Sequence, residues 1–130
     1  MAKHRVLVVD DYPDSAQIAC ALLELLGHDC RAATSGQDAL IAAAQFEPDV
    51  IILDIGLPDV SGLELAPRLR AQLAGRPLYL AAVTGWSQPE DRARSLAAGF
   101  DQHFIKPADR RKLTLIMELA DRAPATEPRT

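Results

Sequence analysis

Short, uninterrupted apolar runs alternate with amphipathic segments along this chain of 130 residues, and this alternation limits its possible folds more than any other feature. The runs at residues 6–9, 50–53 and 78–83 contain no polar residue, which is typical of strands buried on both faces of a sheet. Two more polar segments, 29–33 and 102–105, fit strands at the edges. The strand starts recur about once per βα unit, so we predict a parallel α/β sheet of five strands.

Helical patterns fill the intervals between these strands. The segment 14–26 ends before Gly27, and it places four large apolar residues on one face: Ile18, Leu22, Leu25 and Leu26. Three later helices begin at a serine followed three positions on by a carboxylate, the pattern of a capping box: Ser35 with Asp38, Ser61 with Glu64, and Ser87 with Glu90. Pro67 falls inside the third helix, where we expect a tolerated kink. A last helix, 110–122, turns four residues inward: Leu113, Ile116, Met117 and Ala120.

Composition favours one soluble domain, which we place at residues 1–122, followed by a flexible tail at 123–130. The 14 basic and 18 acidic residues give a net charge of −4, and the basic residues are scattered, which argues against nucleic-acid binding. No secretory signal or membrane span is evident, so we expect a cytoplasmic protein. Cys20 and Cys30 lack the spacing of a metal site, and we predict that both are reduced, space-filling thiols.

Polar side chains follow four of the five predicted strands at the point where each strand ends. Asp10 and Asp11 follow the first strand, Asp54 the third, Thr84 the fourth and Lys106 the fifth. Singly, each has an ordinary explanation as a helix cap, a turn residue or a solvated charge. In a parallel sheet, however, the carboxyl ends of the strands meet at one edge. Three carboxylates beside one lysine are costly to crowd without a counter-ion, and oxygen ligands favour Mg²⁺.

A carboxylate beside Mg²⁺ can attack phosphorus and form an aspartyl phosphate. We predict that Asp54 is this nucleophile, because it ends the central apolar strand, whereas Asp10 and Asp11 are adjacent and suit metal binding. A lysine and a threonine would bind the phosphoryl oxygens. Asp14, three residues after Asp11, is the better candidate for the cap of the first helix.

Four motifs resemble the receiver domain of response regulators in bacterial two-component systems. They are the pair Asp10 and Asp11, DIGLPDVSG around Asp54, VTG around Thr84 and FIKP around Lys106. The resemblance extends over residues 4–120, nearly the whole chain. It implies a flavodoxin-like, doubly wound fold with a five-stranded parallel sheet of order 2-1-3-4-5 and five flanking helices.

The resemblance also implies roles for single residues. Asp54 would accept a phosphoryl group from a phosphohistidine of a sensor histidine kinase or a histidine phosphotransfer protein. Asp10, Asp11 and Asp54 would hold Mg²⁺ together with the backbone carbonyl of Gly56. The division of the metal between Asp10 and Asp11, directly or through water, stays open at this point.

The phosphate-binding and switch residues follow in the same way. Thr84 and Lys106 would bind the phosphoryl oxygens, and the bond before Pro107 would be cis. The family usually has Tyr or Phe at the position of His103, which here is either a switch residue that follows Thr84 or a solvent-facing polar residue on an edge strand. Trp86 is either a loop aromatic packed on its neighbours or a shield or partner contact above the site.

Phosphorylation would alter the face formed by the fourth helix, the fifth strand and the fifth helix, which is the expected surface for a downstream partner or a homodimer. We expect no DNA-binding output domain, and no enzyme beyond catalysis of the domain's own phosphorylation and dephosphorylation. Two alternatives are an adaptor that works without phosphorylation and a receiver excised from a hybrid histidine kinase. An aspartyl-phosphate phosphatase would need a carboxylate where Gly56 stands, and a nucleotide-binding domain would need a glycine-rich loop in place of DDYPDS.

Overall fold

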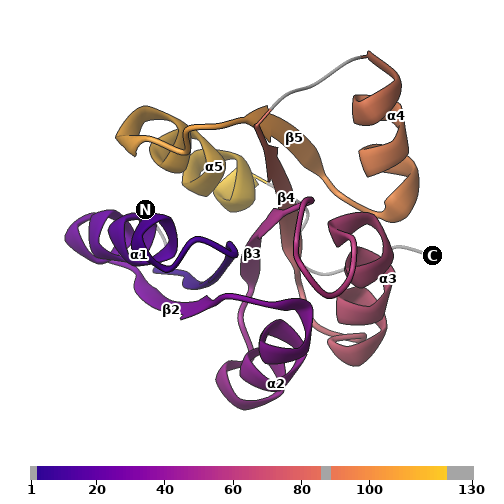
Figure 1. The fold of residues 1–130 in the computed structure, drawn as a ribbon. Helices are drawn as coiled ribbons and strands as arrows, with labels where there is room; N and C mark the ends of the chain where they lie inside the picture. The colour runs from indigo at the N-terminus through magenta and orange to yellow at the C-terminus, as the bar shows by residue number, and fades with distance from the viewer. Residues whose placement is uncertain (1–2, 86–88, 123–130) are drawn as a thin grey trace.

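Five strands alternate strictly with five helices in the computed structural model, which describes residues 3–85 and 89–122 (Figure 1). The predicted tail at 123–130 lies outside this part of the chain. No helix within the described part is long and apolar enough to cross a membrane. The strands are β1 (Arg5–Val9), β2 (Asp29–Ala33), β3 (Val50–Asp54), β4 (Tyr79–Thr84) and β5 (Gln102–Ile105). The helices are α1 (Pro13–Leu25), α2 (Gly36–Phe46), α3 (Gly62–Gln72), α4 (Pro89–Ala98) and α5 (Arg110–Arg122).

The five strands form one parallel sheet in the order β2-β1-β3-β4-β5, as the sequence analysis predicted. The two segments with polar character, β2 and β5, are the edge strands. The central strand β3 is buried along its whole length, because strands pair on both sides of it and helices cover both faces. In this register Asp54 pairs with Val83 and Thr84 with Ile105, so the carboxyl ends of β3, β4 and β5 lie side by side.

Helices cover both faces of the sheet, with α1 and α5 on one side and α2, α3 and α4 on the other (Figure 1). Each layer has its own apolar core, because alternate residues of each strand point to opposite faces. The larger side chains of the α1/α5 core are Val6, Val8, Leu23, Val50, Ile52, Tyr79, Val83, Leu113, Ile116 and Met117. Those of the opposite core are Leu7, Val9, Ile51, Leu53, Leu65, Leu69, Leu73, Leu80 and Phe100.

Helices α2 and α3 begin at the serine caps that the sequence predicted. The hydroxyl of Ser35 accepts a hydrogen bond from the Asp38 N–H, and that of Ser61 accepts one from the Leu63 N–H. Ser87 lies outside the described residues. The prediction for Asp14 was wrong. Helix α1 begins at Pro13 with Tyr12 as its N-cap residue, so Asp14 lies in the first turn, where its charge still suits the helix dipole.

The predicted inward face of α1 needs a correction. Ile18 is 63% exposed and Leu25 is 83% exposed. The residues that α1 buries are Ala16, Ala19 and Leu23. The two alanines carry no bulky side chain, so this face of the helix can lie close to β1. Helix α5 follows its prediction more closely, since Leu113, Ile116 and Met117 are buried.

The two cysteines form a disulfide, which corrects the prediction of reduced, separate thiols. Cys20 on α1 and Cys30 on β2 have Cα atoms 5.3 Å apart, within the range that a disulfide spans. Each residue is partly buried at the edge of the α1/α5 core. The bond joins the first helix to the edge strand that follows it.

Candidate functional site

The carboxylates of Asp10, Asp11 and Asp54 converge at the carboxyl end of the sheet. One carboxylate oxygen from each lies within 4.8 Å of those of the other two. Asp10 and Asp54 are buried, with 9% and 7% exposure, whereas Asp11 is exposed. The structure therefore brings together the three acidic residues that the sequence analysis selected.

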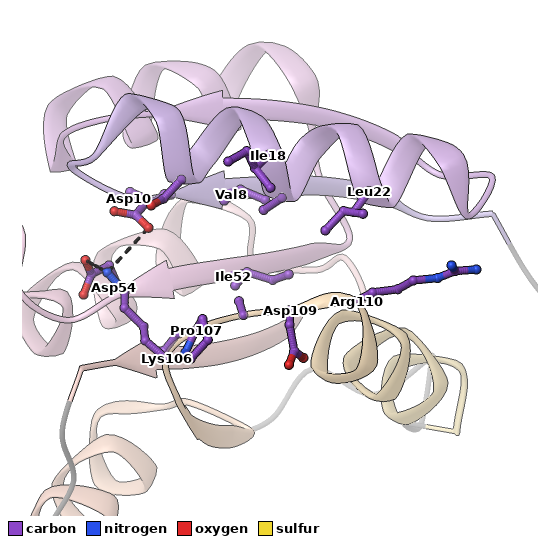
Figure 2. A pocket seen from close by; sticks show the side chains of 15 residues that line it. Val8, Asp10, Ile18, Leu22, Ile52, Asp54, Lys106, Pro107, Asp109 and Arg110 are labelled. Carbon is purple, nitrogen blue, oxygen red and sulfur yellow. Dashed lines mark hydrogen bonds and ion pairs between the residues drawn. The ribbon is translucent and has the colours of Figure 1, made fainter.

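Lys106 supplies the positive charge of this cluster. Its Nζ lies 2.8 Å from Oδ2 of Asp54 and 3.5 Å from Oδ2 of Asp10 (Figure 2). Burial opposes the charged ammonium, but the hydrogen bond and the charge of Asp54, helped by Asp10, outweigh it and raise the pKa of Lys106. The lysine thus stays cationic and holds the Asp54 carboxylate. Its backbone N–H donates to the carbonyl oxygen of Thr84, which fixes the end of β5 against the end of β4.

Backbone groups fix the positions of the two buried carboxylates. Oδ1 of Asp10 accepts from the Tyr12 N–H at 3.0 Å, and Oδ1 of Asp54 accepts from the Gly56 N–H at 3.1 Å. Gly62 supports the loop after β3, because its N–H donates to the Ile55 carbonyl at 2.8 Å. A Cβ atom at Gly62 would lie 2.8 Å from the carbonyl oxygen of Asp54, so only glycine fits there without a backbone shift.

The donor set fits a hard divalent cation. It consists of three carboxylates against one ammonium, which leaves an excess of negative charge, and the Gly56 carbonyl belongs to the same loop. Mg²⁺ prefers oxygen ligands of this kind and is commonly bound by one or two carboxylates with waters. The residues present therefore fit the magnesium that the sequence predicted.

An apolar groove of about 590 Å³ runs from this cluster along the sheet between α1 and α5 (Figure 2). Its volume lies within the usual range for ligand pockets. Asp10, Asp54 and Lys106 line one end, and Asp109 and Arg110 line the other. Apolar side chains line the space between, among them Val8, Ile18, Ala19, Leu22, Ile52, Val83 and Pro107.

His103 points inward from β5, so the solvent-facing interpretation was wrong. The residue is 3% exposed, and its Nδ1 lies 2.8 Å from Oγ of Ser95 on α4. No hydrogen-bond partner for its Nε2 is found among the described residues. Burial lowers the pKa of His103, and the charge of Arg92 adds to this effect although Asp91 opposes it. The imidazole is therefore neutral near pH 7.

Asp59 was not selected from the sequence. Its two carboxylate oxygens accept from the Gly36 and Gln37 N–H groups at the start of α2, at 2.8 and 3.0 Å. These hydrogen bonds lower the pKa of Asp59. The loop that follows Asp54 is thereby attached to α2. The position of Asp59 in DIGLPDVSG offers only a weak signal for this, since the partner amides lie more than 20 residues away.

Two further predictions concern the bond before Pro107 and the role of Trp86. The peptide bond between Lys106 and Pro107 is cis, as the resemblance implied. Trp86 lies outside the described residues.

The sequence profile of the family described as "Response regulator receiver domain" matches residues 6–118. The chain belongs to this family. Receivers of two-component systems bind Mg²⁺ at an acidic pocket and interact with histidine kinases or phosphotransfer proteins, and they are generally not conventional enzymes.

Curated relatives include longer proteins and one of similar length. The transcriptional regulatory protein KdpE of Mycobacterium tuberculosis is 40% identical over 102 residues, which cover 78% of this chain and 44% of KdpE. An uncharacterized 14.6 kDa protein of Leptolyngbya boryana is 30% identical over 118 residues, which cover 91% of this chain and 90% of that protein. The matched residues span less than half the length of KdpE and of another M. tuberculosis regulator, TcrX, that is also 40% identical.

Solved receiver structures match the same architecture. A CheY-like receiver domain from Methylobacillus flagellatus is 33% identical with a TM-score of 0.82, covering 92% of this chain and 99% of that one. A CheY-like receiver from Methanospirillum hungatei is 29% identical with a TM-score of 0.82, covering 92% and 95%. The similarity therefore includes nearly the whole fold.

Proposed function

We propose that this receiver accepts a phosphoryl group on Asp54 in a magnesium-dependent reaction. The observation that carries the proposal is the contact between Lys106 and Asp54, 2.8 Å long, within a cluster of three carboxylates. An adaptor that worked without phosphorylation would have no need for a buried carboxylate paired with a half-buried lysine at the open end of the sheet.

The donor is a phosphohistidine of a histidine kinase or a phosphotransfer protein. An oxygen of Asp54 attacks the phosphorus, an O–P bond forms, and the P–N bond breaks. The histidine nitrogen leaves with the electron pair of that bond. Asp10, Asp11, Asp54 and the Gly56 carbonyl would hold Mg²⁺, which would supply positive charge beside the transferred group.

Lys106 and Thr84 act on the phosphoryl oxygens. The Lys106 ammonium exchanges its partner, from the free carboxylate of Asp54 to an oxygen of the new aspartyl phosphate. The Thr84 hydroxyl donates to a second oxygen. Because Lys106 and Thr84 are joined through their backbones, this rearrangement alters the ends of β4 and β5 together.

His103 passes the change to α4. Thr84 and His103 lie on the paired strands β4 and β5, and the Ser95 hydroxyl connects His103 to α4. The responding surface is the face formed by α4, β5 and α5, and each of these elements has one large apolar side chain that is exposed: Leu96, Ile105 and Leu115. An apolar contact at this face suits a downstream protein or a second copy of the chain.

Incubation with Mg²⁺ and acetyl phosphate, followed by intact-mass measurement, tests the proposal. The wild type is expected to gain one phosphoryl group, and so is Asp14→Ala, which removes an exposed carboxylate of α1. Asp54→Ala is expected to gain none, and chelation of the metal is expected to abolish the gain in every variant. An unchanged mass of the wild type, under conditions that phosphorylate a control receiver, contradicts the proposal. Phosphorylation of Asp54→Ala contradicts it equally.

A further inference from the structure

A histidine cluster lies at the amino-terminal edge of the sheet, opposite the acidic site. His4 precedes β1 and is buried, and both of its ring nitrogens contact carboxylates. Nδ1 lies 2.8 Å from Oδ2 of Asp49, just before β3, and Nε2 lies 2.6 Å from Oδ1 of Asp121, in the last turn of α5. One imidazole thus connects two elements of the sheet layer to the end of the final helix.

This geometry requires a charged His4. A neutral imidazole has one N–H donor and one lone pair, whereas the imidazolium has two donors. In a neutral ring, one of the two nitrogens would face a carboxylate oxygen with its lone pair, at a distance that is repulsive. Only the imidazolium donates to Asp49 and Asp121 at once.

His28 packs against His4, and its ring is neutral. The two rings are stacked, with centroids 5.4 Å apart, and the His4 backbone N–H donates to Nδ1 of His28 at 3.0 Å. Because Nδ1 accepts, the proton of His28 sits on Nε2, which is buried without a partner among the described residues. Burial and the charge of His4 lower the pKa of His28. A second cation in this stack is therefore disfavoured.

We propose that the His4 imidazolium is a pH-sensitive latch that fixes the C-terminal turn of α5 to the base of the sheet through Asp121. Loss of the His4 proton replaces one of the two hydrogen bonds by a repulsive contact. Asp49 is fixed by further bonds, since its Oδ1 accepts from the Arg5 N–H at 2.8 Å and its backbone carbonyl accepts from the Tyr79 N–H at 2.9 Å. The α5 side of the latch, which is held at a helix end, is the side that opens.

The remaining charges around the cluster do not replace these partners. Lys3 is exposed and pairs with Asp29 at 3.4 Å. The guanidinium of Arg5 lies over Phe46 and donates to its carbonyl oxygen. On α5, Arg122 is exposed. Burial disfavours the charged form of His4, but the hydrogen bonds and charges of Asp49 and Asp121 outweigh it and raise the pKa of His4.

The raised pKa of His4 determines how the stability of the latch changes with pH. A raised pKa in the folded state gives stabilisation that is complete below the unfolded value of about 6.5 and is lost as the pH rises through the folded value. The latch is therefore closed at mildly acidic pH and opens towards alkaline pH. Because α5 also forms part of the proposed partner face, opening would loosen the helix at the end opposite the phosphoacceptor.

NMR titration of the imidazole nitrogens tests the latch in the full chain. His4 is expected to titrate above about 6.5, and His28 to remain the neutral Nε2–H tautomer until the pH falls below that value. Amide exchange in the last turn of α5, corrected for its intrinsic pH dependence, is expected to accelerate as His4 loses its proton. One unit of pKa shift corresponds to about a tenfold change in the opening constant.

Asp121→Asn is the decisive variant, since it removes one charge and keeps the shape of the side chain. It is expected to lower the pKa of His4, because it removes one of the two carboxylates that stabilise the imidazolium, and to remove the pH dependence of exchange at the end of α5. The matched control is Asp109→Asn, which makes the same change at the other end of α5 and should leave His4 unaltered. A His4 pKa at or below the unfolded value, or one that Asp121→Asn leaves unchanged, overturns the latch. None of these measurements depends on phosphorylation of Asp54.

Discussion

The hydroxyl of Ser95 on α4 and Nδ1 of His103 on β5 lie 2.8 Å apart, and both side chains are buried. Ser95 donates its proton to the Asp91 carbonyl, so its oxygen accepts from the imidazole N–H. The resemblance to receivers predicts a Tyr or Phe ring at this position, where the chain has His103. Here, a neutral imidazole hydrogen-bonded to α4 takes the place of that ring.

Substitution Ser95→Ala is expected to destabilise the fold by about 1–3 kcal/mol, because it leaves the buried imidazole N–H unpaired. Thr114→Ala is the matched control. Thr114 makes the same type of hydrogen bond, to the Arg110 carbonyl one turn earlier, but no other side chain in the described part of the chain is hydrogen-bonded to it. Urea unfolding of the three proteins checks this. Equal losses in the two variants would mean that the bond to His103 contributes nothing.

Below about pH 6.5, where the contribution of His4 is complete, the stability of the domain is expected to decrease as the solution becomes more acidic, in part because of His103. Its pKa is lowered in the folded state, so its stabilising effect is complete above the unfolded value of about 6.5 and is lost as the pH falls towards the folded value. His103→Phe removes this group and should flatten the acidic side of the profile. His28, whose pKa is also lowered, accounts for a remaining slope of the same sign.

Urea unfolding from about pH 5 to 7.5 provides this profile. His103→Phe also removes the bond to Ser95, so the slope against pH, and not the absolute stability, is the relevant quantity. A slope identical to that of the wild type would show that His103 does not titrate in this range.

The fold and the acidic site could be predicted because both follow from patterns along the chain. Apolar runs without polar alternation indicate strands that are buried on both faces, and in a parallel sheet their carboxyl ends meet. Asp10 and Asp54 each follow such a run directly, and Lys106 follows the edge segment 102–105, so their convergence did not require knowledge of any side-chain conformation. The edge positions of β2 and β5 followed from their polar composition in the same way.

The contacts that the sequence analysis did not predict join residues that are distant in the sequence, and no local pattern indicates that these residues meet. His4 and Asp121 are 117 residues apart, and Asp59 and Gly36 are 23 residues apart. The disulfide between Cys20 and Cys30 depends on how α1 lies on β2, which hydrophobic spacing alone does not fix. Hydrophobic spacing also failed to show that Ile18 and Leu25 are exposed. The largest apolar residues of α1 suggested one inward face, but its small alanines are the residues that pack against the sheet.

Gly62→Ala is expected to destabilise the domain and to slow phosphorylation of Asp54. The new Cβ would lie 2.7 Å from Cα of Ile55 and 2.8 Å from the carbonyl oxygen of Asp54, so the loop after β3 must shift. Overpacking of this kind costs about 1–3 kcal/mol. Gly85→Ala is the comparison for stability, because a Cβ there meets open space. Similar unfolding free energies for the two variants would mean that the close approach at Gly62 is easily relieved.

Lys106→Met is expected to change metal binding and phosphoryl transfer in opposite directions. Removal of the ammonium takes away the only cation paired with Asp54 and Asp10 among the described residues, so the carboxylates should bind Mg²⁺ more tightly. The same change removes a positive charge from the phosphoryl oxygens in the transition state, and we expect phosphorylation to slow by about 10²–10³-fold.

Lys112→Met is the matched control, since Lys112 donates to the Ile105 carbonyl and not to the acidic cluster. Magnesium titration by calorimetry and the rate of phosphorylation by acetyl phosphate give the two quantities. Parallel losses of both would indicate that Lys106 shapes the site instead of balancing its charge, because a collapsed site neither binds the metal nor accepts phosphate.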